Sequence, residues 1–305
     1  MKKQTFVAYL AIITAMLFWS LSFVWYKEAY KLFTPISVIF IRLLIASILL
    51  SITALTVFKI QKIDKRHYKF FLLLAFFEPF LYFMAEGHGI NYTSATVASV
   101  IVALIPLLTP FATRIFLKTP INNIHLIGLV ISFGGVGIVV SAGSTDFSAD
   151  SLGIGLMFMA VLSALGYSIV LVKLMKFYNT ITIITFQNIL AVIFFLPFFL
   201  SFELDTIASI PMTLENYSPV LKLSFFASFL AFSLFVYSIK RIGITIANMF
   251  TYLIPAFTAL FAFIIIKETL SIQAIIGIMI VIFGLALPHL SKFKKQSSKT
   301  DSTTH

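Results

Sequence analysis

Long apolar segments separated by short polar ones make up almost the whole chain. Most are about 20 residues long, which is the length of a helix that crosses a bilayer. They are continuously apolar rather than alternating, so the pattern predicts helices and argues against membrane-spanning strands. The predicted segments are 6–26, 36–58, 70–90, 94–116, 123–142, 152–174, 181–202, 219–239, 244–266 and 270–289.

One part of this pattern occurs twice. The stretch Ile105–Ile138 aligns with Ile254–Leu285 at one constant offset and without gaps, which places Pro106 on Pro255. A repeat of this length decides the architecture, so we predict two copies of five helices each. The same register pairs Thr109 with Thr258, Ile115 with Ile264, Lys118 with Lys267, Gly128 with Gly277, and Gly135 with Gly284.

Basic residues in the predicted loops indicate the orientation. With ten spans, most Lys and Arg residues fall on one side of the membrane, and that side is cytoplasmic. Both termini are then cytoplasmic. Because each copy has an odd number of helices, the second copy is inverted relative to the first. The basic residues on the cytoplasmic side are Lys2, Lys3, Lys59, Lys62, Lys65, Arg66, Lys69, Arg114, Lys118, Lys173, Lys176, Lys240, Arg241, Lys292, Lys294, Lys295 and Lys299.

The predicted fold class is therefore an all-α integral membrane protein with ten transmembrane helices in two inverted five-helix repeats. The first repeat is predicted at 1–142 and the second at 143–290. The segment 291–305 is rich in Lys, Ser and Thr, so we predict a disordered cytoplasmic tail. Inverted repeats of this kind build alternating-access transporters, with the binding site near the midplane between the copies.

The composition agrees with this class. Hydrophobic residues make up 60% of the chain and charged residues 11%, whereas a soluble domain has about 25% charged residues. We expect a multi-pass protein of the cell (inner or plasma) membrane. The net charge of +11 does not require nucleic acid, because basic loops next to anionic lipid explain it.

Metal and cofactor sites are not expected. The chain has no cysteine, which excludes disulfides and thiolate ligands. His88 lies close to Glu86 in sequence, but not at the helical spacing that a metal pair would need. The glycines of the sequence FGGVGIVV, beginning at Phe133, lie inside a predicted helix and indicate close helix packing rather than a dinucleotide loop.

Four stretches of the chain together form a recognisable pattern. They are LFWSLSFVWYK at Leu17–Lys27, a proline and an arginine at Pro35 and Arg42, YTSATVASVIVALIPLLT at Tyr92–Thr109, and KETLSIQAIIGIMIVIFG at Lys267–Gly284. These stretches resemble the EamA-type branch of the drug/metabolite transporter superfamily. The resemblance covers nearly the whole chain. It implies two inverted five-helix units that move small metabolites, commonly by export of amino acids or toxic compounds.

One departure from the family pattern concerns an acidic residue. The family often has a glutamate where the first copy has Lys118 and Thr119, and only Glu268 of the second copy represents that acid.

Ionisable residues inside a membrane are rare and costly, so each is a candidate site residue. Arg42 lies in the second predicted helix, and Glu78 and Glu86 lie in the third. Glu78, Tyr82 and Glu86 are spaced four residues apart and share one helix face. The alternative is a buried structural cluster. Arg42 and Glu86 lie at similar predicted depths, so we predict a structural ion pair between them.

Glu78 lies near the predicted midplane without a basic residue at matching depth. Burial without a partner favours the uncharged carboxyl group. Our hypothesis is that Glu78 couples transport to a proton, or binds the cationic group of the solute, with Tyr82 one turn away.

Prolines and aromatic residues complete the candidate site. Pro106 and Pro255 interrupt their predicted helices near the midplane, where freed carbonyl groups can bind solute or permit movement, although prolines are also common in membrane helices. Trp19 and Tyr167 lie in the first predicted helix of each copy, and each is either a cavity wall or interfacial packing. Asn248 and Tyr252 share a face one turn before Pro255.

The functional hypothesis is a secondary transporter, expected to be an exporter, of a small organic metabolite such as an amino acid or a drug-like cation. The inverted repeat carries this hypothesis. The partners expected are the solute, the lipid bilayer and a coupling proton. The alternatives are a membrane-embedded enzyme acting on lipid, or a non-transporting scaffold or channel subunit. An enzyme would gather acids, histidine or a Ser/Lys pair at one interface, and these polar groups are scattered, so we expect no enzymatic activity.

Overall fold

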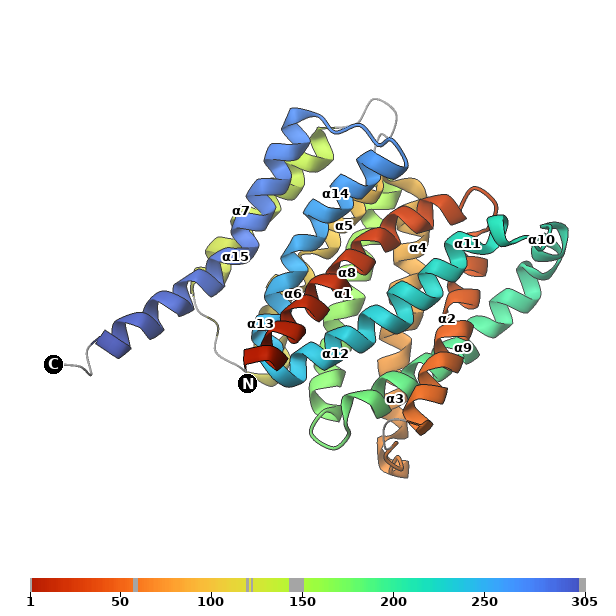
Figure 1. The fold of residues 1–305 in the computed structure, drawn as a ribbon, viewed down its shortest axis with the longest axis horizontal. Helices are drawn as coiled ribbons and strands as arrows, with labels where there is room; N and C mark the ends of the chain where they lie inside the picture. The colour runs from red at the N-terminus through yellow and green to blue at the C-terminus, as the bar shows by residue number, and fades with distance from the viewer. Residues whose placement is uncertain (1, 57–59, 119–120, 122, 143–150, 302–305) are drawn as a thin grey trace.

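The structure, a computed structural model, describes residues 2–56, 60–118, 121, 123–142 and 151–301 (Figure 1). The first residues of the predicted second repeat, 143–150, lie outside the described residues. The elements are α1 (Lys2–Ala29), α2 (Pro35–Thr56), η1 (Lys65–His67), α3 (Tyr68–Ala75), η2 (Phe76–Leu81), α4 (Tyr82–Tyr92), α5 (Ala95–Val102), α6 (Ile105–Leu117), α7 (Asn123–Ser141), α8 (Ser151–Leu174), α9 (Thr180–Phe202), α10 (Leu204–Ser209), α11 (Leu214–Lys222), η3 (Leu223–Leu230), α12 (Ala231–Ile242), α13 (Ile244–Phe250), η4 (Thr251–Leu253), α14 (Ile254–Ile265) and α15 (Ile272–Asp301).

The described residues form an all-helical bundle, as the sequence predicted. Nine of their helical stretches are long and apolar enough to cross a membrane, and 272–288 is a shorter apolar helix. The predicted count of ten spans, and the cytoplasmic placement of both termini, remain predictions. α15 continues as a helix to Asp301, where the sequence predicted a disordered tail. A helix that is already nucleated needs only to propagate, which costs less than starting a new one.

Four of the predicted spans are irregular, and they occupy equivalent places in the two copies. The third and the eighth predicted spans each contain a π-helical stretch, η2 and η3. The fourth and the ninth are each divided, and Pro106 and Pro255 lie in the first turn of the helix after the break. Proline has no N–H to donate, so the first turn of a helix tolerates it best.

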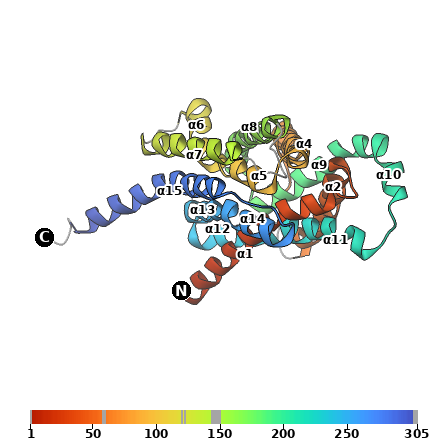
Figure 2. The same cartoon turned by 90° about the horizontal axis from the view of Figure 1, so that it is seen from above.

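The packing of the helices repeats the same symmetry. Two pairs of equivalent helices lie against each other: α2 with α9, and α7 with α15. The fourth and ninth predicted spans also meet, through α5 of the first copy and α14 of the second. The contact of α1 with α12 has its counterpart in the contact of α8 with α4. Figures 1 and 2 show α7 and α15 side by side at one edge of the bundle. This exchange of equivalent partners is what a pseudo-two-fold axis in the membrane plane produces.

The crossing of α7 and α15 shows that the copies run in opposite directions. A β-carbon placed on Gly128 would lie 2.5 Å from the carbonyl oxygen of Gly284, and one on Gly135 would lie 2.8 Å from that of Gly277. Each glycine therefore faces the equivalent of the other. At the centre of the crossing, the Ser132 hydroxyl donates to the Val281 carbonyl at 3.2 Å. Small residues let the two backbones meet, which is how membrane helices often pack.

The repeat also extends to backbone conformation. Lys118 and Lys267, which align in the sequence, are both left-handed, with φ of 56° and 57°. Among the described residues they are the non-glycine residues with positive φ. The chain therefore leaves α6 and α14 by similar tight turns.

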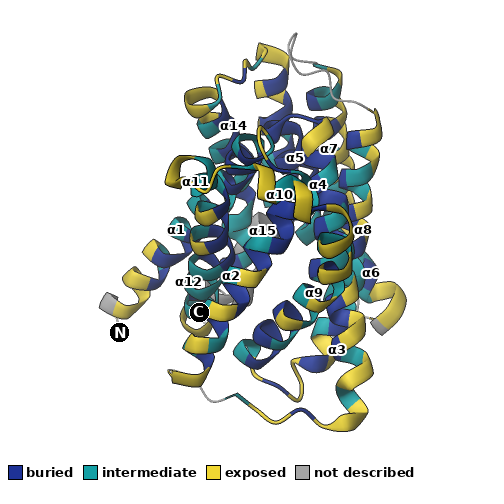
Figure 3. Ribbon diagram, turned by 90° about the vertical axis from the view of Figure 1, so that its right-hand side faces the viewer, coloured by how far each residue is buried: buried dark blue, intermediate teal, exposed yellow. Residues whose placement is uncertain are grey.

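Burial follows the interfaces between helices. Buried residues gather where helices face one another, and exposed apolar residues cover the outer faces of the bundle (Figure 3). Apolar side chains on the outer faces of a helical bundle are suited to contact with lipid, so this distribution fits a membrane protein.

The α7–α15 crossing makes a prediction about stability. Gly128→Ala places a methyl group against the Gly284 carbonyl, and we expect a loss of about 1–3 kcal/mol, as for other overpacked sites. Gly137→Ala is the matched control, since nothing lies within 4 Å of a β-carbon there. The measurement is the thermal unfolding midpoint of each variant in detergent. Equal midpoints for the two variants would contradict the close approach.

The predicted orientation is testable because the chain has no cysteine. Met212 is 90% exposed between α10 and α11, and Lys62 is exposed between α2 and η1. In intact cells, an impermeant maleimide is expected to label Met212→Cys and not Lys62→Cys. Labelling of both variants, or of Lys62→Cys alone, would refute the predicted orientation.

Candidate functional site

A cavity of about 230 Å³ lies between the two repeats. Residues of α1, α2, η2, α4 and the α5–α6 break supply most of its lining, and the second repeat contributes Phe232, Thr251 and Ile254. The walls are mainly apolar, with one guanidinium and two carboxyl groups among them. This composition is typical of small-molecule sites, in which a few polar groups orient a ligand within an apolar pocket.

Arg42 is the cation at this cavity. It lies on α2, and its side chain is only 4% exposed. Its Nε donates to the hydroxyl of Ser228, and its Nη1 donates to the hydroxyl of Tyr26 at 2.5 Å. The ring centroid of Phe83 lies 4.5 Å from its Cζ, which adds a cation–π contact.

Glu86 faces the same cavity but bonds to a different partner. The Tyr82 hydroxyl donates to Glu86 Oε1 at 2.8 Å, one helical turn away. No nitrogen of Arg42 lies within 4 Å of the Glu86 carboxylate, so the direct ion pair that the sequence predicted is absent from the described residues. The prediction was wrong because position along a helix gives the depth of a side chain in the membrane. It does not determine which neighbouring side chains contact the guanidinium.

Glu78 lies where the third predicted span breaks. Pro79 disfavours helical geometry in the residue before it, and Glu78 accordingly adopts an extended conformation, with φ −145° and ψ 124°. Its side chain is half-buried and lines the cavity. Among the residues that the structure describes, it makes no hydrogen bond and no ion pair within 4 Å. A carboxyl group at the cavity is therefore available to a solute or a proton.

Trp19 forms an aromatic wall. Its indole Nε1 donates to the Ala227 carbonyl at 3.1 Å, and its ring meets that of Phe232 edge to face, with centroids 5.1 Å apart. The partners come from the second repeat, so Trp19 also joins the two copies. Pro106 lines the cavity as well, next to the α5–α6 break.

The remaining predicted site residues lie elsewhere. Tyr167 donates to Gln187 Oε1 at 3.2 Å and packs with α3 and α9. Neither Asn248, Tyr252 nor Pro255 lines the cavity; Thr251 takes that place. The short 3-10 segment η4 changes the helical period there, so residues that share a face in an ideal α-helix no longer do.

Several residues of the site are not evident from the sequence pattern. Tyr26, Phe83, Phe232 and Thr251 stand in apolar segments rich in similar residues, so the pattern offered no signal for them. Ser228 did offer one, because it is a polar residue within the apolar stretch Leu223–Leu230.

Polar contacts join the two repeats at one end of α9. The Glu203 carboxylate, at the carboxyl end of α9, accepts hydrogen bonds from the hydroxyls of Thr34 and Ser37 at 2.5 and 2.7 Å. These residues begin α2, and Glu203 is only 4% exposed. A carboxylate is favourable at a helix N-terminus, where the backbone N–H groups and the helix dipole attract it.

A second set of contacts joins the repeats at the other end of α9. Gln61 Oε1 accepts from the backbone N–H of Asn179 at 2.5 Å, and the Gln61 N–H donates to Thr182 Oγ1 at 3.0 Å. The loop from the first repeat thus bonds to the start of α9, as Glu203 bonds to the start of α2. Polar contacts between the repeats therefore occur at both ends of α9.

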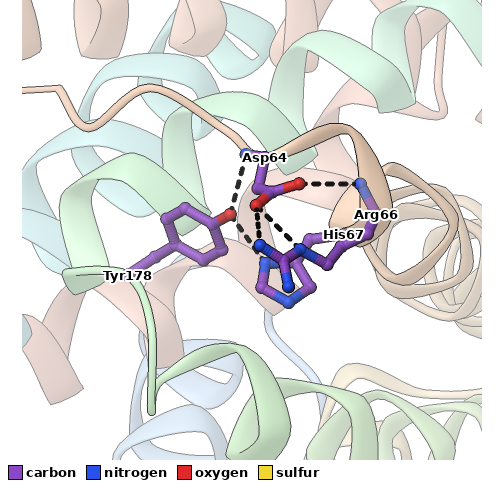
Figure 4. A network of polar contacts seen from close by, with 4 residues as sticks. All are labelled: Asp64, Arg66, His67 and Tyr178. Atoms are coloured by element: carbon purple, nitrogen blue, oxygen red, sulfur yellow. Dashed lines mark hydrogen bonds and ion pairs between the residues drawn. The ribbon is translucent and has the colours of Figure 1, made fainter.

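Tyr178 extends this second set (Figure 4). Its hydroxyl accepts from the Asp64 N–H at 3.0 Å and lies 2.8 Å from His67 Nδ1. Arg66 pairs with Asp64 at 2.8 Å, and the hydrogen bond from its side chain lowers the pKa of that carboxyl group.

Glu268 represents the acidic residue that the first copy lacks. It is 2% exposed, and its Oε1 accepts from the Thr96 N–H at 3.4 Å, at the start of α5. The equivalent position in the first copy is Thr119, which lies outside the described residues. The acid therefore belongs to a contact between the repeats rather than to the cavity.

The fold and the cavity define a multi-pass membrane transporter built from two inverted copies of one helical unit. The sequence profile described as "EamA-like transporter family" matches residues 6–141 and 151–288, so the chain belongs to that family. Each match covers one of the two repeats, and the family resemblance seen in the sequence is confirmed.

Similar proteins are also named as transporters. An "uncharacterized transporter" of Archaeoglobus fulgidus is 28% identical over 283 residues, which cover 92% of this chain and 96% of that protein. The "uncharacterized transporter YetK" of Bacillus subtilis is 27% identical over 83% of this chain and 77% of its own. A solved crystal structure matches with a TM-score of 0.67 at 15% identity, over 95% of this chain and 97% of its own, and shows the fold alone.

The contact at Glu203 makes a further prediction. Glu203→Ala leaves the buried hydroxyl of Ser37 and the half-buried hydroxyl of Thr34 without their acceptor, and we expect a loss of about 1–3 kcal/mol of stability. Glu215→Ala, which changes an exposed acid nearby, is the control. Thermal unfolding in detergent measures both, and a Glu203→Ala midpoint equal to that of Glu215→Ala would show that the contact does not stabilise the fold.

Proposed function

We propose that the protein is a secondary transporter that exports small organic solutes bearing a cationic group, such as an amino acid or a drug-like cation. The observation that carries the proposal is the cavity between the two repeats, where Glu78 has no partner among the described residues. The volume of about 230 Å³ lies below the roughly 300–1,000 Å³ of drug-sized pockets, which favours a small solute.

The cavity walls suit a solute with both apolar and charged parts. Trp19 and Phe232 offer ring faces or edges to an apolar group, and the Glu78 carboxylate offers a counter-charge to an ammonium group. An aromatic ring beside a carboxylate also attracts cations through its π face. We propose that the site binds the solute and catalyses no reaction of it.

The proposed mechanism is alternating access. The cavity lies next to the α5–α6 break and to η4, which are the irregular parts of equivalent spans. Broken helices at the interface of inverted repeats are where such carriers change conformation. The contacts at the two ends of α9 join the same pair of equivalent helices. Breaking the contacts at one end while keeping those at the other would open the cavity to one side.

Glu78 is proposed as the coupling acid. In surroundings of low polarity, a lone carboxylate is costly and gains from either a proton or a cation. One carboxylate cannot hold both at the same time, so the two would compete for Glu78. Exchange of an entering proton for a departing cationic solute then follows, and an inward proton gradient drives export.

Glu78→Gln tests this role. The amide cannot exchange a proton, so we expect facilitated counterflow to persist and pH-driven accumulation to disappear. A gradient of one pH unit supports about a tenfold solute gradient, since each corresponds to about 1.4 kcal/mol, and we expect this ratio to fall to about one. The assay uses proteoliposomes and a solute chosen by thermal-shift screening of amino acids, nucleosides and cationic drugs.

Two further variants complete the test. Glu78→Asp keeps the acid and is expected to retain part of the coupling, and Glu215→Gln, on the surface, is expected to behave like the native protein. Uphill transport by Glu78→Gln with an unchanged pH profile would assign Glu78 a structural role.

A further inference from the structure

Three helices from both repeats hold the guanidinium group of Arg42. Tyr26 of α1 accepts from Nη1, Phe83 of α4 stacks against the charged face, and Ser228 of η3 accepts from Nε. Ser228 is the partner that comes from the second repeat. A planar group that is fixed at two nitrogens and on one face has little freedom to rotate.

The local structure of η3 sets the position of Ser228. Its hydroxyl donates to the carbonyl of Leu223, five residues earlier, at 3.1 Å. Ser224 and Ser233 instead donate to carbonyls four residues earlier, as in an ordinary α-helix. The wider π-helical turn therefore uses the one hydroxyl proton of Ser228, and its oxygen lone pairs remain for the Arg42 Nε.

The remaining donors of Arg42 have no partner among the described residues. Its hydrogen bonds there involve Nε and Nη1, and no carboxylate lies within 4 Å. Arg42 nevertheless lines the cavity. A buried guanidinium with open donors at a cavity is well suited to bind an anionic group, because carboxylates and phosphates match its two-pronged geometry.

We propose that Ser228 is a positioning residue that turns the open edge of Arg42 into the cavity, and that the transporter thereby selects solutes carrying an anionic group. This inference rests on the proposed function, and it adds an anionic requirement to the cationic one. The anionic group of the solute binds Arg42, while its cationic group binds Glu78. Ser228 itself does not touch the solute.

The first test compares acids with the amines that lack the carboxylate. The probe pairs are L-phenylalanine with 2-phenylethylamine, and L-leucine with 3-methylbutylamine, measured by binding to the purified full-length protein and by counterflow in proteoliposomes. We expect Ser228→Ala to weaken the binding of the acids about tenfold, as the loss of one hydrogen bond to a charged group would, and to change that of the amines less than about twofold.

Matched variants separate positioning from general destabilisation. Ser224→Ala removes a buried hydroxyl from the same segment that does not bond to Arg42, so the native preference for acids is expected to remain. Ser228→Thr keeps the hydroxyl and is expected to restore the preference. A loss of fold alone would weaken acids and amines together.

The second test observes Arg42 directly and needs no solute. The chain has only four arginines, and Arg66, Arg114 and Arg241 are exposed. In a spectrum of the ¹⁵N-arginine-labelled protein, the Nε–H of Arg42 is expected to exchange slowly with water. In Ser228→Ala this signal is expected to exchange at least about tenfold faster, because its acceptor is gone.

The outcomes decide between the two proposals. An unchanged Arg42 signal in Ser228→Ala, or a changed signal with an unchanged preference for acids, overturns the role of Ser228. Counterflow of amines and acids without discrimination by the native protein also overturns it, but leaves transport standing. A native protein that binds and moves none of these probes, nor any solute of the screening panel, overturns the proposed function and this inference with it.

Discussion

A polar group buried inside a protein has only other protein groups to bond with, and this constraint governs how the two repeats meet. The Arg42 guanidinium, the Glu203 carboxylate and the Glu268 carboxylate are each almost fully buried. Each of them has a hydrogen-bond partner in the opposite repeat. An unsatisfied group of this kind costs several kcal/mol, by general estimates for lipid surroundings. These contacts therefore make each repeat dependent on the other.

The same constraint explains where the helices break. A break frees backbone groups, which membrane proteins tolerate only against protein or a cavity. The breaks at Glu78 and before Pro106 both lie at the cavity. The π-helical turn at Ser228 is another departure from regular α-helical geometry, and it brings a hydroxyl oxygen to Arg42. These irregular segments and the candidate site are thus the same part of the molecule.

Much of the architecture follows from periodicity and repetition. The apolar segments predict the helices, since only a helix forms its backbone hydrogen bonds within a single segment in lipid. The alignment of Pro106 with Pro255 and of Lys118 with Lys267 predicts two equivalent units, and the structure shows the same breaks and the same left-handed turns. The free-energy cost of an ionisable residue inside a membrane was enough to identify Arg42, Glu78 and Glu86 as candidates, and all three line one cavity. Such features are local, or they repeat, so a single chain displays them.

The hydrogen-bond partners of polar side chains across the bundle do not follow from the local pattern, because they depend on distances between residues far apart in the chain. Helical spacing placed Glu86 at the depth of Arg42, yet Tyr26 and Ser228 reach the guanidinium and Tyr82 takes the carboxylate. Tyr167 and Tyr252 had suitable chemistry, but neither lines the cavity, and Tyr167 packs with α3 and α9 instead. Local pattern decided the helices and the repeat. Packing decided which polar groups meet, since rotations and breaks of a few residues move a side chain by several ångströms.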